Sequence, residues 1–221
     1  MPTFHHVWEP PGDDRSPVIL ALHGTGGSER DLVGVARAIA PGAGILAPRG
    51  QVVEGDGMPR FFRRIPTGQP GPYPFAFDAD EIAERAAELV GFVQQRLEAE
   101  GLASRPLAVT GFSNGANMAS ALLLLHPGVA QVAALFAPMP VLDDPPRPRL
   151  DEAAVWLGAG RRDPIATPDL VERLAGQLSE RGAAVDVAFY ECGHEVTPDA
   201  VRGAAAWMAK ARAATGGADL P

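Results

Sequence analysis

Two kinds of hydrophobic pattern alternate along most of the 221-residue chain. Short apolar or β-branched runs, which are typical of buried strands, occupy residues 17–22, 43–47, 106–110, 129–136, 154–157 and 184–190. Stretches with helical spacing lie among them, at residues 29–39, 80–100, 114–125, 168–180 and 198–213. In the clearest of these, 80–100, apolar residues such as Ile82, Leu89 and Val93 share one face, and Gly101 follows as a stop signal.

This alternation predicts βαβ units and therefore an α/β fold, in which a mainly parallel, twisted sheet is covered by helices on both faces. Residues 3–8 are expected to add an antiparallel strand at one edge. The length favours one domain over residues 1–215, and residues 216–221 are interpreted as a flexible tail.

One segment breaks the alternation. Residues 48–77 hold 11 Gly or Pro among 30 residues and show no sustained hydrophobic period. A loop of this length inside a compact domain is uncommon and often forms a wall or lid of an active site. It carries the run Arg60, Phe61, Phe62, Arg63, Arg64. Two interpretations stay open: the loop packs its own aromatic rings and solvates its arginines, or it faces the substrate.

Composition and charge exclude several function classes. Hydrophobic residues at 46% and charged residues at 21% are ordinary for a folded protein, and a net charge of -8 would repel nucleic acids and anionic lipids. Neither a signal peptide nor a membrane-spanning run is visible, so a cytoplasmic location is expected. Cys192 is the only cysteine, which excludes an internal disulfide and favours a packing role for this thiol.

The sharpest chemical signal is the sequence Gly111, Phe112, Ser113, Asn114, Gly115, a G-x-S-x-G motif. A predicted strand ends just before it and a predicted helix begins within it, which is the strand, sharp turn and helix arrangement that this motif requires. Such a turn exposes the serine hydroxyl, and the helix N-terminus favours developing negative charge. The alternative is an ordinary glycine-flanked turn in which Ser113 caps the helix.

A nucleophilic serine needs a histidine to accept its proton and an acid to orient that histidine. His194 follows the strand predicted at 184–190 and is the best candidate base, whereas His5, His6 and His126 lie where structural roles are expected. Asp163 follows the strand predicted at 154–157 and is the favoured acid. Asp143 and Asp144, one strand earlier, are its rivals. The resulting chain order of serine, aspartate and histidine is that of the α/β-hydrolases.

The loop His23, Gly24, Thr25, Gly26, Gly27 follows the first buried strand and supplies candidate oxyanion donors. The backbone N–H groups of Thr25 and Asn114 are expected to form the oxyanion hole, and His23 to brace the loop. A phosphate-binding glycine loop is the competing interpretation, but neither a P-loop lysine nor a full G-x-G-x-x-G motif accompanies it.

These residues resemble those of the α/β-hydrolase superfamily, and within it the small, cap-less phospholipase/carboxylesterase type related to dienelactone hydrolases. The matching pieces span nearly the whole chain: LHGTGG at 22–27, RFFRR at 60–64, GFSNG at 111–115, GAGRRDP at 158–164 and GHE at 193–195. The resemblance implies the same triad and oxyanion roles at Ser113, Asp163, His194, Thr25 and Asn114. Dienelactone hydrolases proper use a cysteine nucleophile, whereas this chain has Ser113.

The expected function is a serine carboxylesterase that acts on a small-molecule ester without cofactor or metal, with a homodimer left open. A thioesterase or lysophospholipase with the same triad is the first alternative, and a non-catalytic binding protein on the same scaffold is the second. Residues expected in the wall of the substrate pocket are Met58, Phe61, Phe62 and Met139, together with Arg60 or Arg63 as partners of a substrate carboxylate.

Overall fold

The computed structural model describes residues 3–68, 75–143 and 145–215, the side chains of 212–215 excepted. Its centre is a seven-stranded sheet in the order β1-β3-β2-β8-β9-β10-β11. The strands are β1 His6–Glu9, β2 Val18–Leu22, β3 Gly44–Pro48, β8 Leu107–Phe112, β9 Val132–Phe136, β10 Ala154–Gly160 and β11 Ala184–Tyr190. All neighbours run parallel except β1, which pairs antiparallel with β3. The predicted fold class is confirmed.

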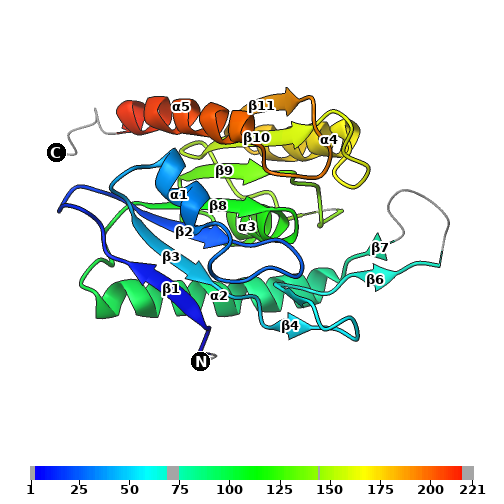
Figure 1. Ribbon diagram of the computed structural model, residues 1–221, viewed down its shortest axis with the longest axis horizontal. Helices are drawn as coiled ribbons and strands as arrows, with labels where there is room; N and C mark the ends of the chain where they lie inside the picture. The colour runs from blue at the N-terminus through cyan, green and yellow to red at the C-terminus, as the bar shows by residue number, and fades with distance from the viewer. Residues whose placement is uncertain (1–2, 69–74, 144, 216–221) are drawn as a thin grey trace.

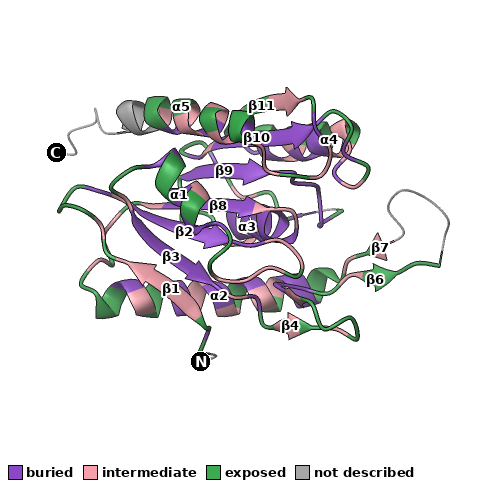
Figure 2. Cartoon of the chain, viewed as in Figure 1, coloured by how far each residue is buried: buried purple, intermediate pink, exposed green. Residues whose placement is uncertain are grey.

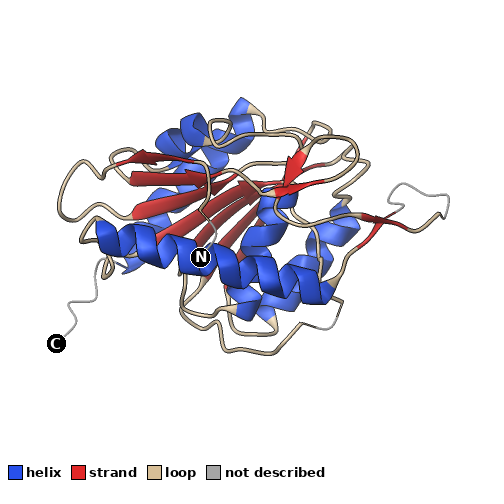
Figure 3. Ribbon diagram, turned by 90° about the horizontal axis from the view of Figure 1, so that it is seen from below, coloured by secondary structure: helices blue, strands red, loops and turns tan. Residues whose placement is uncertain are grey.

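Helices cover both faces of this sheet, as Figure 3 shows. They are α1 Val33–Ile39, α2 Ala79–Ala99, α3 Asn114–Leu125, α4 Pro168–Ser179 and α5 Pro198–Thr215. Successive strand residues serve opposite faces: Val18 and Leu20 of β2 pack in the cluster that holds α2, α3 and α4, whereas Ile19 and Ala21 pack with α1 and α5. The central strands are therefore buried on both sides, and β1 and β11 at the edges are only partly buried (Figure 2).

Some boundaries differ from those predicted. The edge strand spans His6–Glu9 rather than residues 3–8, because Phe4 leaves the strand and packs against Phe92 of α2, with ring centroids 4.8 Å apart. Helix α1 begins at Val33 rather than at residue 29, because Ser28 and Asp31 form a turn in which the serine hydroxyl donates to the Asp31 carboxylate at 2.7 Å.

The Gly- and Pro-rich segment 48–77 is not without secondary structure. It forms two short antiparallel ladders, β4 Val52–Val53 with β5 Pro59–Arg60, and β6 Ile65–Pro66 with β7 Phe75–Ala76. Strands of two residues are too short to produce a visible period, which is why the sequence indicated only a loop. Strands β6 and β7 project beyond the carboxyl ends of the parallel strands (Figure 1). The tail predicted at 216–221 lies outside the described residues.

The strand order creates a switch point between β2 and β8. The chain passes from β2 to β3 on one side and later returns to β8 on the other, so the loops after β2 and β8 leave in different directions. The pairing of Leu22 with Gly111 places the ends of these two strands side by side. In open α/β sheets, ligands bind at the carboxyl ends of the strands beside such a switch point. None of the described helices is long and apolar enough to cross a membrane.

Candidate active site

Ser113 lies in a sharp turn between β8 and α3, with φ of 51° and ψ of -119°. A non-glycine residue in this region of backbone space is strained and is held there by its surroundings. The flanking glycines explain how the turn fits: a Cβ on Gly111 would lie 2.6 Å from the backbone of α3, and one on Gly115 would lie 2.1 Å from the carbonyl oxygen of Leu22. The two elbow glycines therefore allow α3 to pack directly against β8 and β2.

Three loops bring Ser113, His194 and Asp163 into one hydrogen-bonded chain. The Ser113 Oγ lies 2.9 Å from Nε2 of His194, and Nδ1 of His194 lies 2.7 Å from Oδ2 of Asp163. A carboxylate only accepts, so it assigns the ring proton to Nδ1 and leaves Nε2 free to accept from the serine hydroxyl. This is the arrangement by which a histidine serves as general base for a serine nucleophile.

Asp163 is anchored from its other oxygen. Its side chain is fully buried, and Oδ1 accepts hydrogen bonds from the backbone N–H groups of Ile165 at 2.8 Å and Ala166 at 2.9 Å. The rival Asp143 is exposed and pairs with Arg173 of α4 at 3.0 Å. Asp144 lies outside the described residues. Of the two acids that can be placed, Asp163 is the one that contacts His194.

The loop after β2 faces the same turn. Thr25 and Asn114 line one cavity together with Ser113 and His194. Among the described residues, neither the Thr25 nor the Asn114 backbone N–H donates to another protein group. Gly24 lets the loop approach β8, because a Cβ there would lie 2.9 Å from the ring of Phe112. Two backbone N–H groups without a partner among the described residues, beside a serine hydroxyl, are what an oxyanion hole requires.

Comparison with known proteins supplies the context for this geometry. MhqD of Bacillus subtilis (strain 168), which is named as a hydrolase, is 35% identical over 206 residues, covering 93% of this chain and 98% of its own. The chain belongs to the α/β-hydrolase superfamily. Within it, the chain is of the small phospholipase/carboxylesterase type and is an enzyme of the hydrolase class.

Solved structures agree with this assignment. A carboxylesterase from Bacillus cereus is 34% identical and superposes with a TM-score of 0.87 over 94% of each chain. A carboxylesterase from Mesorhizobium loti is 36% identical, with a TM-score of 0.79 over 90% of each chain. No family model matches the sequence. In the described part of this hydrolase, no group of three or more His, Cys, Asp or Glu side chains is arranged to hold a metal ion.

The cavity beside Ser113 has a volume of about 170 Å³ in the described part of the hydrolase. Met139, which was expected in its wall, does line it, and the loop that carries Met139 is tied to α3 because its N–H donates to Oδ1 of Asn117 at 2.9 Å. The remaining wall was not anticipated from the sequence. It consists of Arg64, Phe77, Phe112, Asn117 and Ile165.

Five residues expected in this wall lie elsewhere, and each has a physical reason. Phe61 and Phe62 are buried in the main hydrophobic core, and Phe62 meets Phe77 edge to face. Arg60 is buried and takes its ion pairs from Glu54 and Asp56 within its own segment. Met58 and Arg63 are exposed, and Arg63 extends to Glu81 of α2.

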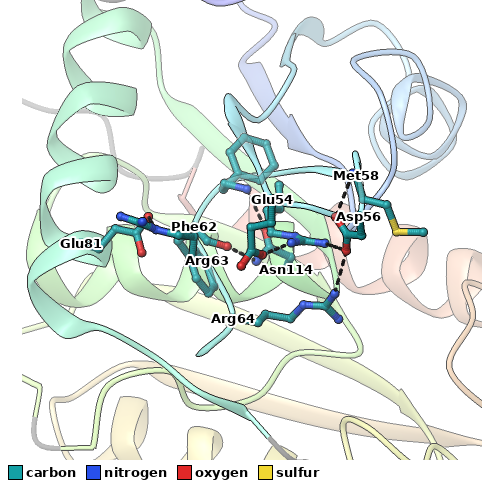
Figure 4. Close-up of polar contacts among 10 residues, drawn as sticks. Glu54, Asp56, Met58, Phe62, Arg63, Arg64, Glu81 and Asn114 are labelled. Carbon is teal, nitrogen blue, oxygen red and sulfur yellow. Dashed lines mark hydrogen bonds and ion pairs between the residues drawn. The ribbon is translucent and has the colours of Figure 1, made fainter. Parts of the chain in front are cut away.

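The sequence carried only a weak signal for Arg64. It lay within the same run as the arginines that were singled out, and nothing local separated the three. Figure 4 shows the difference: the Arg63 side chain points toward Glu81, whereas Arg64 points the opposite way, toward Asp56.

His23 braces the loop after β2 as a neutral ring. Its Nδ1 donates to the carbonyl of Gly24 at 2.7 Å, and its Nε2 accepts from the N–H of Gly50 at 2.9 Å. Burial lowers the pKa of the His23 imidazole below its ordinary value of 6.5. A second proton would cost the bond from Gly50, since the protonated ring has no acceptor.

This histidine should make stability depend on pH. In the unfolded chain His23 takes up a proton near pH 6.5, whereas in the folded chain it does so only at lower pH. The contribution of His23 to the free energy of unfolding is therefore complete above about pH 6.5 and is lost as pH falls below it. Urea unfolding at pH 7.5, 6.5 and 5.5 measures the free energy of unfolding. As pH falls, this free energy should decline less steeply in His23→Gln than in wild type, by up to about 1.4 kcal/mol per pH unit. Replacement of the exposed His5 by glutamine is the matched control, and a wild-type slope in His23→Gln would refute the assignment.

Proposed function

We propose that this hydrolase cleaves carboxylic esters through an acyl-enzyme on Ser113. The proposal rests above all on the hydrogen-bonded chain from Ser113 through His194 to Asp163, which begins at a cavity that Thr25 and Asn114 also line. The carboxylesterase names of the two structural relatives agree with this substrate class.

In the first half of the reaction, His194 Nε2 accepts the hydroxyl proton as Ser113 Oγ attacks the ester carbonyl. The carbonyl oxygen takes on negative charge and receives hydrogen bonds from the N–H groups of Thr25 and Asn114. Asp163 stabilises the resulting imidazolium through Nδ1–H without taking its proton. When the tetrahedral intermediate collapses, His194 returns the proton to the leaving alcohol and the acyl group stays on Ser113.

In the second half, water replaces the serine. The water oxygen attacks the acyl carbonyl while His194 accepts a proton from the water. The same N–H groups stabilise the second oxyanion. Collapse releases the carboxylic acid and returns the proton to Ser113 Oγ. No step draws on a group outside the chain except water.

The small cavity favours a short-chain esterase over a lysophospholipase. Its volume of about 170 Å³ lies below the roughly 300–1,000 Å³ of sites that enclose drug-sized ligands. We therefore expect kcat/KM for p-nitrophenyl esters to be highest for acetyl or butyryl groups and at least about tenfold lower for dodecanoyl, whose chain cannot be enclosed. An optimum at eight or more carbons would contradict the prediction.

The thioesterase alternative shares every residue of the mechanism, so it is separated by the substrate alone. The same acyl group is offered as an oxygen ester and as a thioester, and the two kcat/KM values are each divided by the rate of base-catalysed hydrolysis. A corrected ratio that favours the thioester would replace the esterase assignment with the alternative.

A further inference from the structure

Arg64 is the one fully charged side chain among the described residues that line the cavity beside Ser113. The other described lining residues are polar, apolar or the histidine of the proposed triad, and none is Asp or Glu. The protein as a whole carries a net charge of -8, so the general field repels anionic substrates. Arg64 places a positive charge in the cavity beside Ser113, where it would locally oppose this repulsion of anions.

The carboxylates near Arg64 are already engaged by Arg60. Arg60 is buried and pairs with both Glu54 and Asp56, the latter at 2.6 Å. Arg64 shares Asp56 only at 3.7 Å, which is beyond hydrogen-bond distance. Its Nε is buried and has no hydrogen-bond partner in the part of the chain that the structure describes. With respect to the described residues, the guanidinium of Arg64 therefore has unused donors and only a weak counter-charge. Figure 4 shows its pairing with Asp56.

The position of Arg64 is tied to the catalytic turn. The side chain of Asn114, the residue after the nucleophile, accepts from the N–H of Phe61 at 2.7 Å and donates to the carbonyl of Phe62 at 3.4 Å. The Arg64 guanidinium stacks on the ring of Phe75, 4.8 Å from its centroid. The backbone just before Arg64 is thus fixed to the catalytic turn, and its guanidinium is held against an aromatic ring, which positions the charge for recognition.

We propose that Arg64 selects esters that carry a second, anionic group, a carboxylate, in addition to the ester that is cleaved. The inference deepens the proposed esterase function and rests on it. The planar guanidinium matches a carboxylate with two parallel N–H donors, and no acidic side chain among the described lining residues competes for it. The carboxylate is held by Arg64 while the ester carbonyl lies at Ser113.

The test uses matched pairs of substrates that differ only in charge. On the acyl side, the mono-p-nitrophenyl ester of glutaric acid is compared with the p-nitrophenyl ester of its monoamide. On the alcohol side, 4-acetoxybenzoate is compared with 4-acetoxybenzamide. Rates are corrected for spontaneous hydrolysis with the Ser113→Ala protein. We expect the carboxylate to have the higher kcat/KM in at least one pair, with an advantage that shrinks as salt is added.

Two substitutions assign this advantage to Arg64. In Arg64→Met, the ratio of kcat/KM for the carboxylate ester to that for the carboxamide ester should fall about tenfold. This loss is larger than the effect of removing an exposed ion pair and smaller than that of removing a buried one. The ratio in Arg64→Lys should lie between those of Arg64→Met and wild type, because lysine keeps the positive charge but lacks the two parallel N–H donors of the guanidinium. Arg63→Met is the matched control, since Arg63 is exposed, lies outside the cavity lining and pairs with Glu81. Its ratio should equal that of wild type.

The outcomes separate this inference from the function on which it rests. If the neutral esters are cleaved in a Ser113-dependent way but neither pair shows a carboxylate advantage, the role of Arg64 is refuted and the esterase function stands. The same holds if Arg64→Met keeps the wild-type ratio, or if Arg63→Met lowers it equally. If no ester of either charge is cleaved, the proposed function itself fails.

Discussion

Replacing Ser113 by alanine is expected to lower kcat/KM for a short acyl p-nitrophenyl ester by at least about 10⁴-fold. The substitution removes the atom that forms the acyl bond, and water is a far weaker nucleophile even when the oxyanion donors polarise the ester carbonyl. The fold should survive, because alanine adds no atom to the crowded turn. Ala137, at φ 48°, shows that this chain accommodates an alanine at positive φ.

A serine on the following helix provides the control. Ser120 of α3 is buried and donates to the carbonyl of Asn117 at 2.8 Å, so its hydroxyl is used within the helix. A fluorophosphonate probe should label wild type and Ser120→Ala but not Ser113→Ala, and thermal unfolding should show all three folded. Labelling of Ser113→Ala, or turnover above about one per cent of wild type, would remove Ser113 from the role of nucleophile. A wild-type protein that takes no label would instead support a binding protein on the hydrolase scaffold.

Replacing Asp163 by asparagine should lower kcat by about 10⁴-fold while leaving the fold intact. The reason lies in the two N–H groups of Ile165 and Ala166, which donate to Oδ1. They hold the amide oxygen of the new asparagine on their side and so turn its NH₂ group toward Nδ1 of His194. A donor at that place forces the ring proton onto Nε2, where the histidine can no longer accept from Ser113.

The rival acid is the natural control for this substitution. Asp143 is exposed and pairs with Arg173, so Asp143→Asn should change kcat by less than about twofold. Kinetics on the same short ester, together with circular dichroism of both variants, makes the comparison. A large loss in Asp143→Asn with little change in Asp163→Asn would reassign the acid.

The architecture was predictable from the sequence because its signals are local. Each parallel strand is a short, mainly apolar run, each helix carries its own apolar face, and these patterns do not depend on distant residues. The turn around Ser113 was predictable for the same reason, since its strand, glycines and helix follow one another directly. Boundaries shifted where side chains at an element's end found other contacts, as Phe4 did against Phe92.

The segment 48–77 resisted prediction because the directions of its side chains depend on which partners the fold brings to them. Arg60 turns to Glu54 and Asp56 within the segment, whereas Arg63 turns to Glu81 of α2. The backbone between them is held by Asn114, more than fifty residues away in the chain. Without these partners, the sequence offers three equivalent cations.

The sequence by itself thus determined the α/β fold, the order of the candidate triad residues along the chain and the loops that carry them. Those loops follow parallel strands, and the carboxyl ends of parallel strands meet at one edge of a sheet. Only the tertiary structure decided the distances from Ser113 to His194 and from His194 to Asp163, that Asp163 rather than Asp143 contacts His194, and which arginine lines the cavity. The physical reason is that hydrophobic period specifies which face of an element is buried, whereas the direction of a loop side chain is set by contacts made across the folded molecule.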